Sequence, residues 1–346
     1  MAASTPAAKQ RYRQGNAKSF HITGTVHQLE YLQGTVYCYI CNYIVNTTLP
    51  NSKSYSLQLV VLTLLTVLTL PTTAWSADDY PELRNSIDPV LQKQLETLVR
   101  QKGLQKAVGQ ERLAIALVDM SDEKKPRMAA INGDVMEYAA SLPKIAILLA
   151  AFVQVEQGKL ELDAKLEADL INMTRHSSNA AATRVLDLVG REELLRILES
   201  PKFMLYDRRY DGGLWVGKAY AKKGAYRRDP LNNISHGITA IQGARFYYLL
   251  DTNRLVGPEL TLKMKQILAD PAINHKFVKG LKARPGVKLY RKSGTWKQFH
   301  ADSALVEFGA HKYIIIGLAE DPQGGKWLEG LAAPLHDLVV KTPAIR

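Results

Sequence analysis

A Ser-x-x-Lys pattern occupies residues 141–144 and places a hydroxyl and an amine three residues apart. The apolar run 141–158 predicts a buried helix that begins at Ser141. Residues three apart share one face of a helix, so Lys144 is expected to reach the Ser141 hydroxyl. A lysine whose pKa is lowered by burial can take the proton of a serine nucleophile. The same pattern at Ser121–Lys124 lies in a polar turn with no apolar helix after it, and we expect a solvated loop there.

A second motif, Ser177-Ser178-Asn179, precedes an Ala-rich helical segment. The Ser177 hydroxyl is suited to passing a proton to a leaving nitrogen, and the Asn179 amide is suited to binding a substrate carbonyl. The alternative is a polar cluster that only caps the following helix.

A third motif, residues 292–295, ends a predicted strand. Lys292 offers a positive charge for a substrate carboxylate, and Ser293 or Thr295 offers a hydroxyl. Gly294 lets a substrate lie close to the backbone. The alternative is an exposed strand end.

In this order and setting, the three motifs resemble the class A β-lactamase and penicillin-binding family of serine hydrolases. The resemblance covers roughly residues 88–342. It implies that Ser141 attacks an amide carbonyl and becomes acylated, and that Lys144 and Ser177 transfer protons. It further implies that Asn179 holds the substrate amide, that Lys292 and Ser293 recognise a carboxylate, and that Gly294 shapes the strand. The N–H groups of Ser141 and Thr295 would form the oxyanion hole.

Two departures from the family pattern bear on turnover. Ser178 stands where the family has Asp, which is expected to leave the neighbouring Ser and Asn in place. No Glu-x-x-Leu-Asn is present for deacylation, and the nearest match, Arg209–Trp215, has Asp211 instead of Glu. Asp211 is therefore the candidate base that activates the hydrolytic water. The favoured alternative is a Tyr-Asp-Gly-Gly turn between two short strands.

Strands near both ends of the chain with helices between them predict an α/β fold. We expect an antiparallel sheet of N- and C-terminal strands, flanked by helices, with a helical subdomain inserted in the middle. The predicted helices are 88–103, 141–158, a region continuing to about 200, 239–250, 258–269 and 326–340. The predicted strands are 112–120, 127–132, 286–296, 301–309 and 312–319, and residues 201–235 are expected to be irregular.

Three segments follow one another along the chain. Residues 1–52 are an extension expected to lie outside the mature fold, 53–76 a signal peptide or an uncleaved membrane anchor, and 77–346 the hydrolase domain. A signal this far from Met1 suggests that translation starts nearer residue 45 to 57. The expected location is the periplasm, either free or anchored and facing it.

The formal net charge is +12, yet no run of five basic residues is present, so a solvated surface is favoured over a nucleic-acid groove. Cys38 and Cys41 lack a second ligand pair for zinc. Neither a metal nor an organic cofactor is expected. His236 and His300 could act as a base or as metal ligands, but eight scattered histidines without ligand spacing favour surface or structural roles. We expect a monomer that acts on a small β-lactam or a peptidoglycan peptide.

Three functions remain open at this point. The first is β-lactam hydrolysis, and the second is a D-alanyl-D-alanine peptidase, which a weak deacylation base favours. The third is a wall-binding protein with an inactive site.

Overall fold

A computed structural model describes residues 80–341. The predicted extension 1–52, the signal or anchor 53–76, and both cysteines lie outside the described residues. Within the described range, no helix is both long and apolar enough to cross a bilayer.

A five-stranded antiparallel sheet joins the two ends of the described chain, with strand order β2-β1-β10-β9-β8. Its strands are β1 (Leu113–Asp119), β2 (Arg127–Ile131), β8 (Lys288–Trp296), β9 (Phe299–Phe308) and β10 (His311–Glu320). The predicted α/β architecture, a sheet closed by N- and C-terminal strands around inserted helices, is confirmed.

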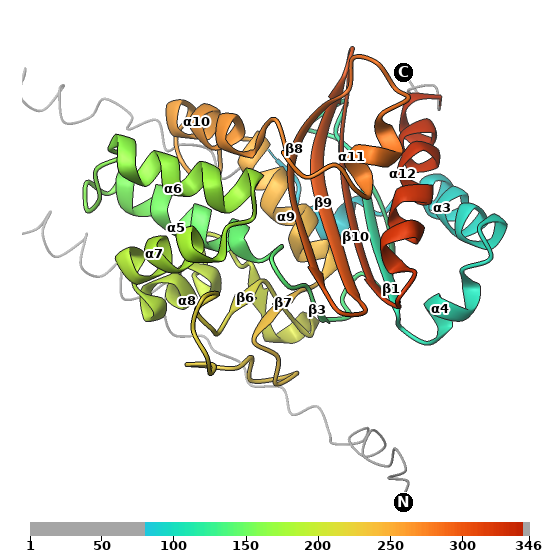
Figure 1. Cartoon of the computed structure of the whole chain (residues 1–346). Coiled ribbons are helices and arrows are strands. Elements are labelled where there is room, and N and C mark those ends of the chain that lie inside the picture. The colour runs from blue at the N-terminus through green and yellow to red at the C-terminus, as the bar shows by residue number, and fades with distance from the viewer. Residues whose placement is uncertain (1–79, 342–346) are drawn as a thin grey trace, which may run out of the picture. The chain divides into compact units, whose positions relative to one another are not determined.

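Alternation along β1 shows why the sheet is covered on both faces. Ala114, Ala116 and Val118 belong to one apolar cluster, which also contains residues of α5 (Lys144–Glu156) and α9 (Ala240–Asp251). The intervening leucines and isoleucine of β1 belong to a second cluster, with residues of α3 (Pro89–Gln101) and α12 (Gly324–Val340). Successive side chains of a strand point to opposite faces, so each face has its own helices. Figure 1 shows α3 and α12 together on the side of the sheet away from the helical subdomain.

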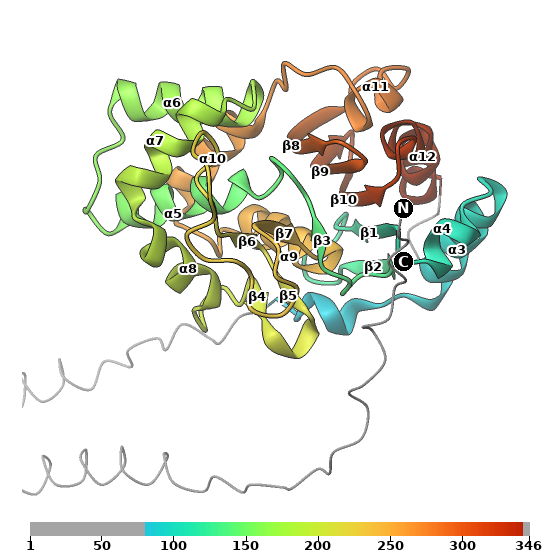
Figure 2. The ribbon, with the colours of Figure 1, turned by 60° about the horizontal axis from the view of Figure 1, so that its bottom comes forward.

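The helical subdomain is built around α5. Residues 144–154 of this helix are all buried, which explains why its sequence is apolar on nearly every side. The helices around it are α6 (Ala164–Arg175), α7 (Asn179–Val189), α8 (Arg191–Glu199) and α10 (Pro258–Leu268). Figures 1 and 2 show these helices on the β8 side of the sheet.

Several short elements were not predicted from the sequence. Three are helices: η1 (Leu83–Ser86), α4 (Gln105–Gly109) and α11 (Phe277–Leu281). The others form a small sheet of β3 (Glu137–Tyr138) with β7 (His236–Ile238) and β6 (Trp215–Val216). A second small sheet, β4 (Tyr206–Asp207) with β5 (Gly212–Gly213), agrees with the favoured interpretation of a turn between two short strands. The last hairpin includes the 3-10 turn η2 (Arg208–Tyr210). Segments of two or three residues are too short to show a periodic pattern.

Candidate active site

The segment before α5 is a tight turn. Ala140 has a positive φ of 51°, and α5 begins at Lys144, three residues later than the predicted start. The Lys144 N–H donates to the Ser141 carbonyl at 3.3 Å, an i to i+3 bond typical of a 3-10 turn. Side chains three apart lie nearly in line in such a turn, so Ser141 and Lys144 still share one side of the helix start.

The Lys144 side chain is completely buried. Its nitrogen lies 2.6 Å from the Ser177 carbonyl oxygen, 2.8 Å from Oδ1 of Asn179 and 3.5 Å from Oγ of Ser177. The ring of Tyr220 lies on a further side, with its centroid 4.6 Å from the nitrogen. Because burial penalises the charged form, the pKa of Lys144 is lowered to about 7.

The residues of the middle motif have two different roles, helix capping and contact with Lys144. Ser178 is the N-cap of α7, and its side chain accepts a hydrogen bond from the Ala181 N–H. Ser177 has a positive φ of 57°, and both it and Asn179 contact the Lys144 nitrogen. The expectation that replacing Asp by Ser178 leaves its two neighbours in place agrees with this geometry. The capping alternative describes Ser178 alone.

Lys292 approaches the same group from the sheet. It lies on β8, which is the edge strand and the strand nearest the helical subdomain (Figure 1). Its buried side-chain nitrogen donates to the Ser177 hydroxyl at 3.0 Å and to the Ser293 carbonyl at 2.6 Å. Desolvation lowers the pKa of Lys292 well below its usual value, and the nearby Lys144 adds to the effect.

Gly294 is where the edge strand meets the Ser141 segment. A Cβ added at Gly294 would lie 2.1 Å from the Ala139 carbonyl oxygen and 2.7 Å from the Ser141 nitrogen. No side chain fits there, so a glycine is required by the close approach of two backbones. The contact brings the third motif against the first.

Three nearby residues were not singled out as site residues from the sequence. The Tyr220 hydroxyl donates to the Ala140 carbonyl at 3.2 Å, and its ring lies over the Lys144 nitrogen. His275 Nε2 lies 3.1 Å from the Ser293 hydroxyl. Lys276 donates to the Thr295 hydroxyl at 2.9 Å. The last two precede α11 and carry no motif, so only the tertiary structure reveals them.

Asp211 is not brought into this group. It lies in the turn between β4 and β5 with a left-handed φ of 56°. Its carboxylate accepts from the Met136 N–H at 3.1 Å and from Asn232 Nδ2 at 3.2 Å. The structure therefore shows the turn that was the alternative interpretation, and gives no support to Asp211 as the deacylation base.

His236 has local structural partners. His236 is buried, donates from Nε2 to the Lys218 carbonyl at 2.9 Å and stacks on Tyr220 with ring centroids 4.2 Å apart. Desolvation lowers the pKa of His236 to about 4, so its ring is neutral at pH 7. Among residues 80–341, no group of three or more His, Cys, Asp or Glu side chains is placed to hold a metal ion.

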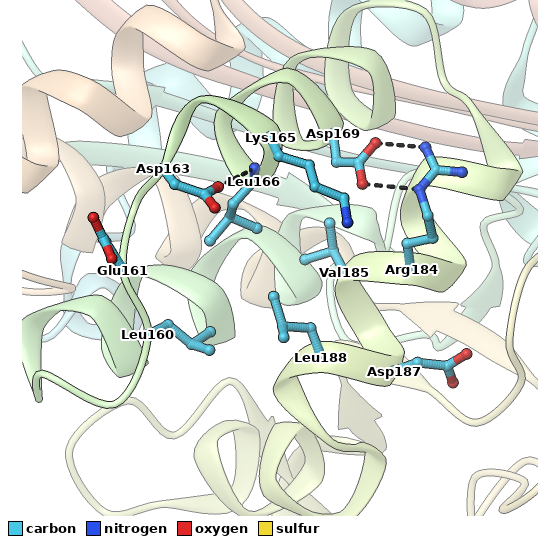
Figure 3. Close-up of a pocket in the computed structure, with 10 residues that line it drawn as sticks. All are labelled: Leu160, Glu161, Asp163, Lys165, Leu166, Asp169, Arg184, Val185, Asp187 and Leu188. Carbon is cyan, nitrogen blue, oxygen red and sulfur yellow. Dashed lines mark hydrogen bonds and ion pairs between the residues drawn. The ribbon is translucent and has the colours of Figure 1, made fainter.

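A pocket of about 500 Å³ lies along α6 and α7 and contains none of the motif residues. Figure 3 shows Asp169 bonded to Arg184 at its rim, with Leu160, Val185 and Leu188 lining it. This carboxylate already has a bidentate arginine partner, so Asp169 itself is not available for a ligand.

Comparison with known proteins identifies a family for the chain. The model of the β-lactamase enzyme family matches residues 90–171 and 168–337. Among solved structures, a β-lactamase from Sphaerobacter thermophilus DSM 20745 has a TM-score of 0.56 and 17% identity, over 70% of this chain and 98% of that chain. The structure of PBP-A has a TM-score of 0.56 and 16% identity, over 74% and 98% of the two chains.

A β-lactamase from Chitinophaga pinensis DSM 2588 is similar, with a TM-score of 0.54 and 15% identity over 69% and 97% of the chains. At these identities the structural likeness shows the fold alone. No curated protein sequence matches the chain. Since the family model matches well over half of its residues, this chain belongs to the β-lactamase enzyme family.

Proposed function

We propose that this chain is a serine amide hydrolase that forms an acyl-enzyme at Ser141, and that β-lactams are substrates for that acylation. The observation that carries the proposal is the convergence of three motifs around the Ser177 hydroxyl, which lies 3.5 Å from the Lys144 nitrogen and 3.0 Å from the Lys292 nitrogen. Lys144 contacts Ser177 and Asn179 directly, and Lys292 contacts the same Ser177 hydroxyl.

The contacts of Lys144 suit a general base. A neutral amine has two N–H donors and one lone pair. The two short contacts, to the Ser177 carbonyl and to Asn179 Oδ1, use both donors. The lone pair is then free to accept the proton of Ser141 as its oxygen attacks an amide carbon. A pKa of about 7 means that much of this lysine is neutral at physiological pH.

The Ser177 hydroxyl is suited to deliver the proton to the leaving nitrogen. Lys292 donates to its oxygen, so its hydrogen is free to point toward a substrate. In the proposed step the Ser141 oxygen bonds to the amide carbon, the carbon–nitrogen bond breaks, and the proton taken by Lys144 reaches the nitrogen through Ser177.

Substrate recognition would follow the same residues. Asn179 uses Oδ1 for Lys144, which leaves its amide N–H groups for a substrate carbonyl. Lys292 and Ser293 stand together on β8 for a carboxylate, with His275 orienting the Ser293 hydroxyl. The N–H groups of Ser141 and Thr295 would bind the developing oxyanion.

A peptidoglycan D-alanyl-D-alanine peptide is the second candidate substrate, and one observation favours it over rapid penicillin hydrolysis. The contacts of the Lys144 nitrogen in the described part of the chain are to Ser177, Asn179 and the Tyr220 ring, and none is to a carboxylate. Asp211, the candidate base, is bonded elsewhere. Without a carboxylate to activate water, a penicilloyl group is expected to leave Ser141 slowly.

The test is intact-mass measurement of the protein after mixing with benzylpenicillin. We expect a one-to-one adduct on the wild type, no adduct on Ser141→Ala, and a normal adduct on Ser121→Ala. Ser121 is a matched control because it also begins a Ser-x-x-Lys sequence but is exposed in a turn. An adduct that persists for minutes supports the peptidase, and turnover without an adduct supports the β-lactamase. Complete inertness would overturn the proposal.

We also propose that the chain acts in the periplasm, because the predicted signal or anchor at 53–76 precedes the domain and the proposed substrates are found there. Intact-mass analysis of protein purified from its native compartment tests this. A species that retains Met1 would contradict signal cleavage.

A further inference from the structure

We propose that Lys276 is a positioning residue for the oxyanion hole, because its ammonium binds the carbonyl end of the peptide unit whose other end is the Thr295 N–H. This inference rests on the proposed function, in which that N–H binds the developing oxyanion. It assigns a role to a buried lysine that lies outside the three motifs.

The Lys276 ammonium makes three hydrogen bonds. It donates to the Gly294 carbonyl at 2.6 Å, to the Thr295 hydroxyl at 2.9 Å and to the Ala301 carbonyl at 3.0 Å. Two of the acceptors lie on β8 and one on β9. The lysine therefore ties the end of the edge strand to its neighbour at the point where β8 meets the Ser141 segment.

These contacts exclude a direct role in substrate binding. A lysine ammonium has three N–H donors, and here each has a protein acceptor. The side chain is also buried, with 2% relative exposure. Lys276 thus has no donor left for a substrate carboxylate, so any effect on the reaction must pass through the backbone that it holds.

The geometry of a trans peptide transmits that effect. In such a peptide the C=O and the N–H point in opposite directions. Gly294 pairs with Ala301 of β9, and the ammonium bonded to both carbonyls lies on that inner side. The Thr295 N–H of the same peptide unit therefore points away from β9, toward the free edge where the Ser141 nitrogen lies close to Gly294.

A positive charge bonded to the Gly294 carbonyl strengthens the Thr295 N–H as a hydrogen-bond donor. Hydrogen bonds that share a peptide unit polarise one another, and a charged donor has a larger effect than a neutral one. Bond lengths place the ammonium roughly 7 Å from an oxyanion held by Thr295. Burial lowers the pKa of Lys276 to about 8, which leaves most of it charged at pH 7.

A buried ion pair holds the segment that carries Lys276. Arg291 of β8 donates to both carboxylate oxygens of Asp302 of β9, at 2.7 and 2.8 Å. The same guanidinium donates to the carbonyls of Ile273 and His275, and Asp302 accepts the Phe277 N–H. Lys276 lies between these anchors with a positive φ of 48°, so its place is set from both sides.

The first test measures the peptide itself, in the free full-length protein. The Gly294 carbonyl ¹³C and Thr295 amide ¹⁵N chemical shifts are compared between wild type and Lys276→Met, which keeps the length of the side chain but removes the ammonium. Lys326→Met is the matched control, because Lys326 lines the same cavity of about 260 Å³ but makes none of the three bonds. We expect both shifts to move in Lys276→Met alone. Unchanged shifts would overturn the proposal.

The second test measures acylation and the acyl-enzyme. We expect Lys276→Met to lower the acylation rate constant with benzylpenicillin about tenfold. Penicillin affinity measured on Ser141→Ala should be the same with and without the lysine change. The infrared stretch of the acyl-enzyme ester carbonyl should move to higher frequency, because the oxyanion donors polarise it less; loss of structural order alone would broaden the band without this directed shift.

The outcomes separate this inference from the proposed function. A wild type that penicillin does not acylate would sink the proposed function, while the chemical shifts would still decide whether Lys276 polarises the peptide. An acylation rate and carbonyl frequency in Lys276→Met equal to those of wild type would overturn the positioning role, even with acylation intact.

Discussion

The Lys144 nitrogen lies 2.8 Å from Oδ1 of Asn179 although the two residues are 35 positions apart in the chain. The group beside the lysine nitrogen is thus a neutral amide oxygen and not a carboxylate, so this contact supplies no negative charge to stabilise the protonated lysine. Desolvation then dominates, and the lysine titrates near neutrality.

Acylation of Ser141 is expected to become faster as the pH rises through about 7. The pKa of Lys144 is lowered to about 7, so its proton is bound below that pH and its lone pair is available above it. The acylation rate constant should therefore increase about tenfold per pH unit on the acid side and level off on the alkaline side. Rapid-quench mass spectrometry with benzylpenicillin between about pH 5.5 and pH 9 checks this. A rate that is flat across pH 7 would contradict Lys144 as the base.

Replacing Asn179 by Asp should move that pH profile upward. A carboxylate at the position of Oδ1 stabilises the charged lysine, so the pKa of Lys144 rises by about one to three units and less of the neutral amine is present at pH 7. Acylation at pH 7 should fall at least about tenfold and recover as the pH increases. The control is Asn233→Asp in an exposed loop, which should leave the midpoint unchanged. An unchanged midpoint in Asn179→Asp itself would show that Lys144 is not the titrating group.

Gly294→Ala should separate β8 from the Ser141 segment. Its Cβ would lie 2.1 Å from the Ala139 carbonyl oxygen. The oxygen is a backbone atom and the Cβ is bonded to the backbone, so neither can rotate away. We expect an acylation rate at least about 100-fold lower, because a shift of 1 Å in a reacting geometry has that effect. Overpacking should also lower the free energy of unfolding by about 1–3 kcal/mol.

The matched control for this glycine is Gly330→Ala in α12, where nothing lies within 4 Å of the added Cβ. It should leave acylation unchanged and raise stability by about 0.5–1 kcal/mol, since alanine favours a helix over glycine. Urea unfolding monitored by circular dichroism measures the change in stability of Gly294→Ala and of Gly330→Ala. Normal acylation by Gly294→Ala would show that the two backbones need not be in contact.

The long elements of the fold could be predicted from the sequence because each has a clear period or a continuous apolar run. The start of α5 was predicted three residues early, since its apolar run includes Leu142. The backbone before Lys144 instead follows the left-handed Ala140 and contacts with the small sheet, where the Ala139 N–H donates to the His236 carbonyl at 3.0 Å. Such contacts join residues far apart in sequence and leave no local pattern.

The candidate site divides in the same way. Ser141, Lys144 and Lys292 were found from short motifs whose spacing is local. Lys276 and Asp302 belong to no sequence motif. They are placed by the pairing of β8 with β9 and by the packing of the segment before α11, which are tertiary contacts. A search of the sequence for buried charges fails here, since nothing in the local sequence marks a lysine with 2% exposure.

Asp211→Asn is expected to leave deacylation unchanged. The carboxylate caps the Met136 N–H and contacts Asn232, and an asparagine keeps an oxygen for the first of these bonds. The lifetime of the penicilloyl adduct, followed by intact mass after removal of free penicillin, should match that of the wild type. An adduct that clears in the wild type but persists in Asp211→Asn would restore Asp211 as the deacylation base.

Removing one partner of the Arg291–Asp302 pair should be strongly destabilising. The two side chains have 2% and 0% relative exposure, so the remaining charge cannot reach water. Arg291→Met leaves Asp302 with only two backbone N–H donors, and we expect a loss of about 3–5 kcal/mol in the free energy of unfolding.

The double variant Arg291→Met/Asp302→Leu removes both charges at once. It should be more stable than the sum of the two single-variant losses predicts, because no buried charge is left without a partner. Urea unfolding of the two single variants and the double variant gives this coupling energy. If the double variant loses as much as the two single variants together, the pair does not act as a unit, and the segment carrying Lys276 must be held by its other contacts.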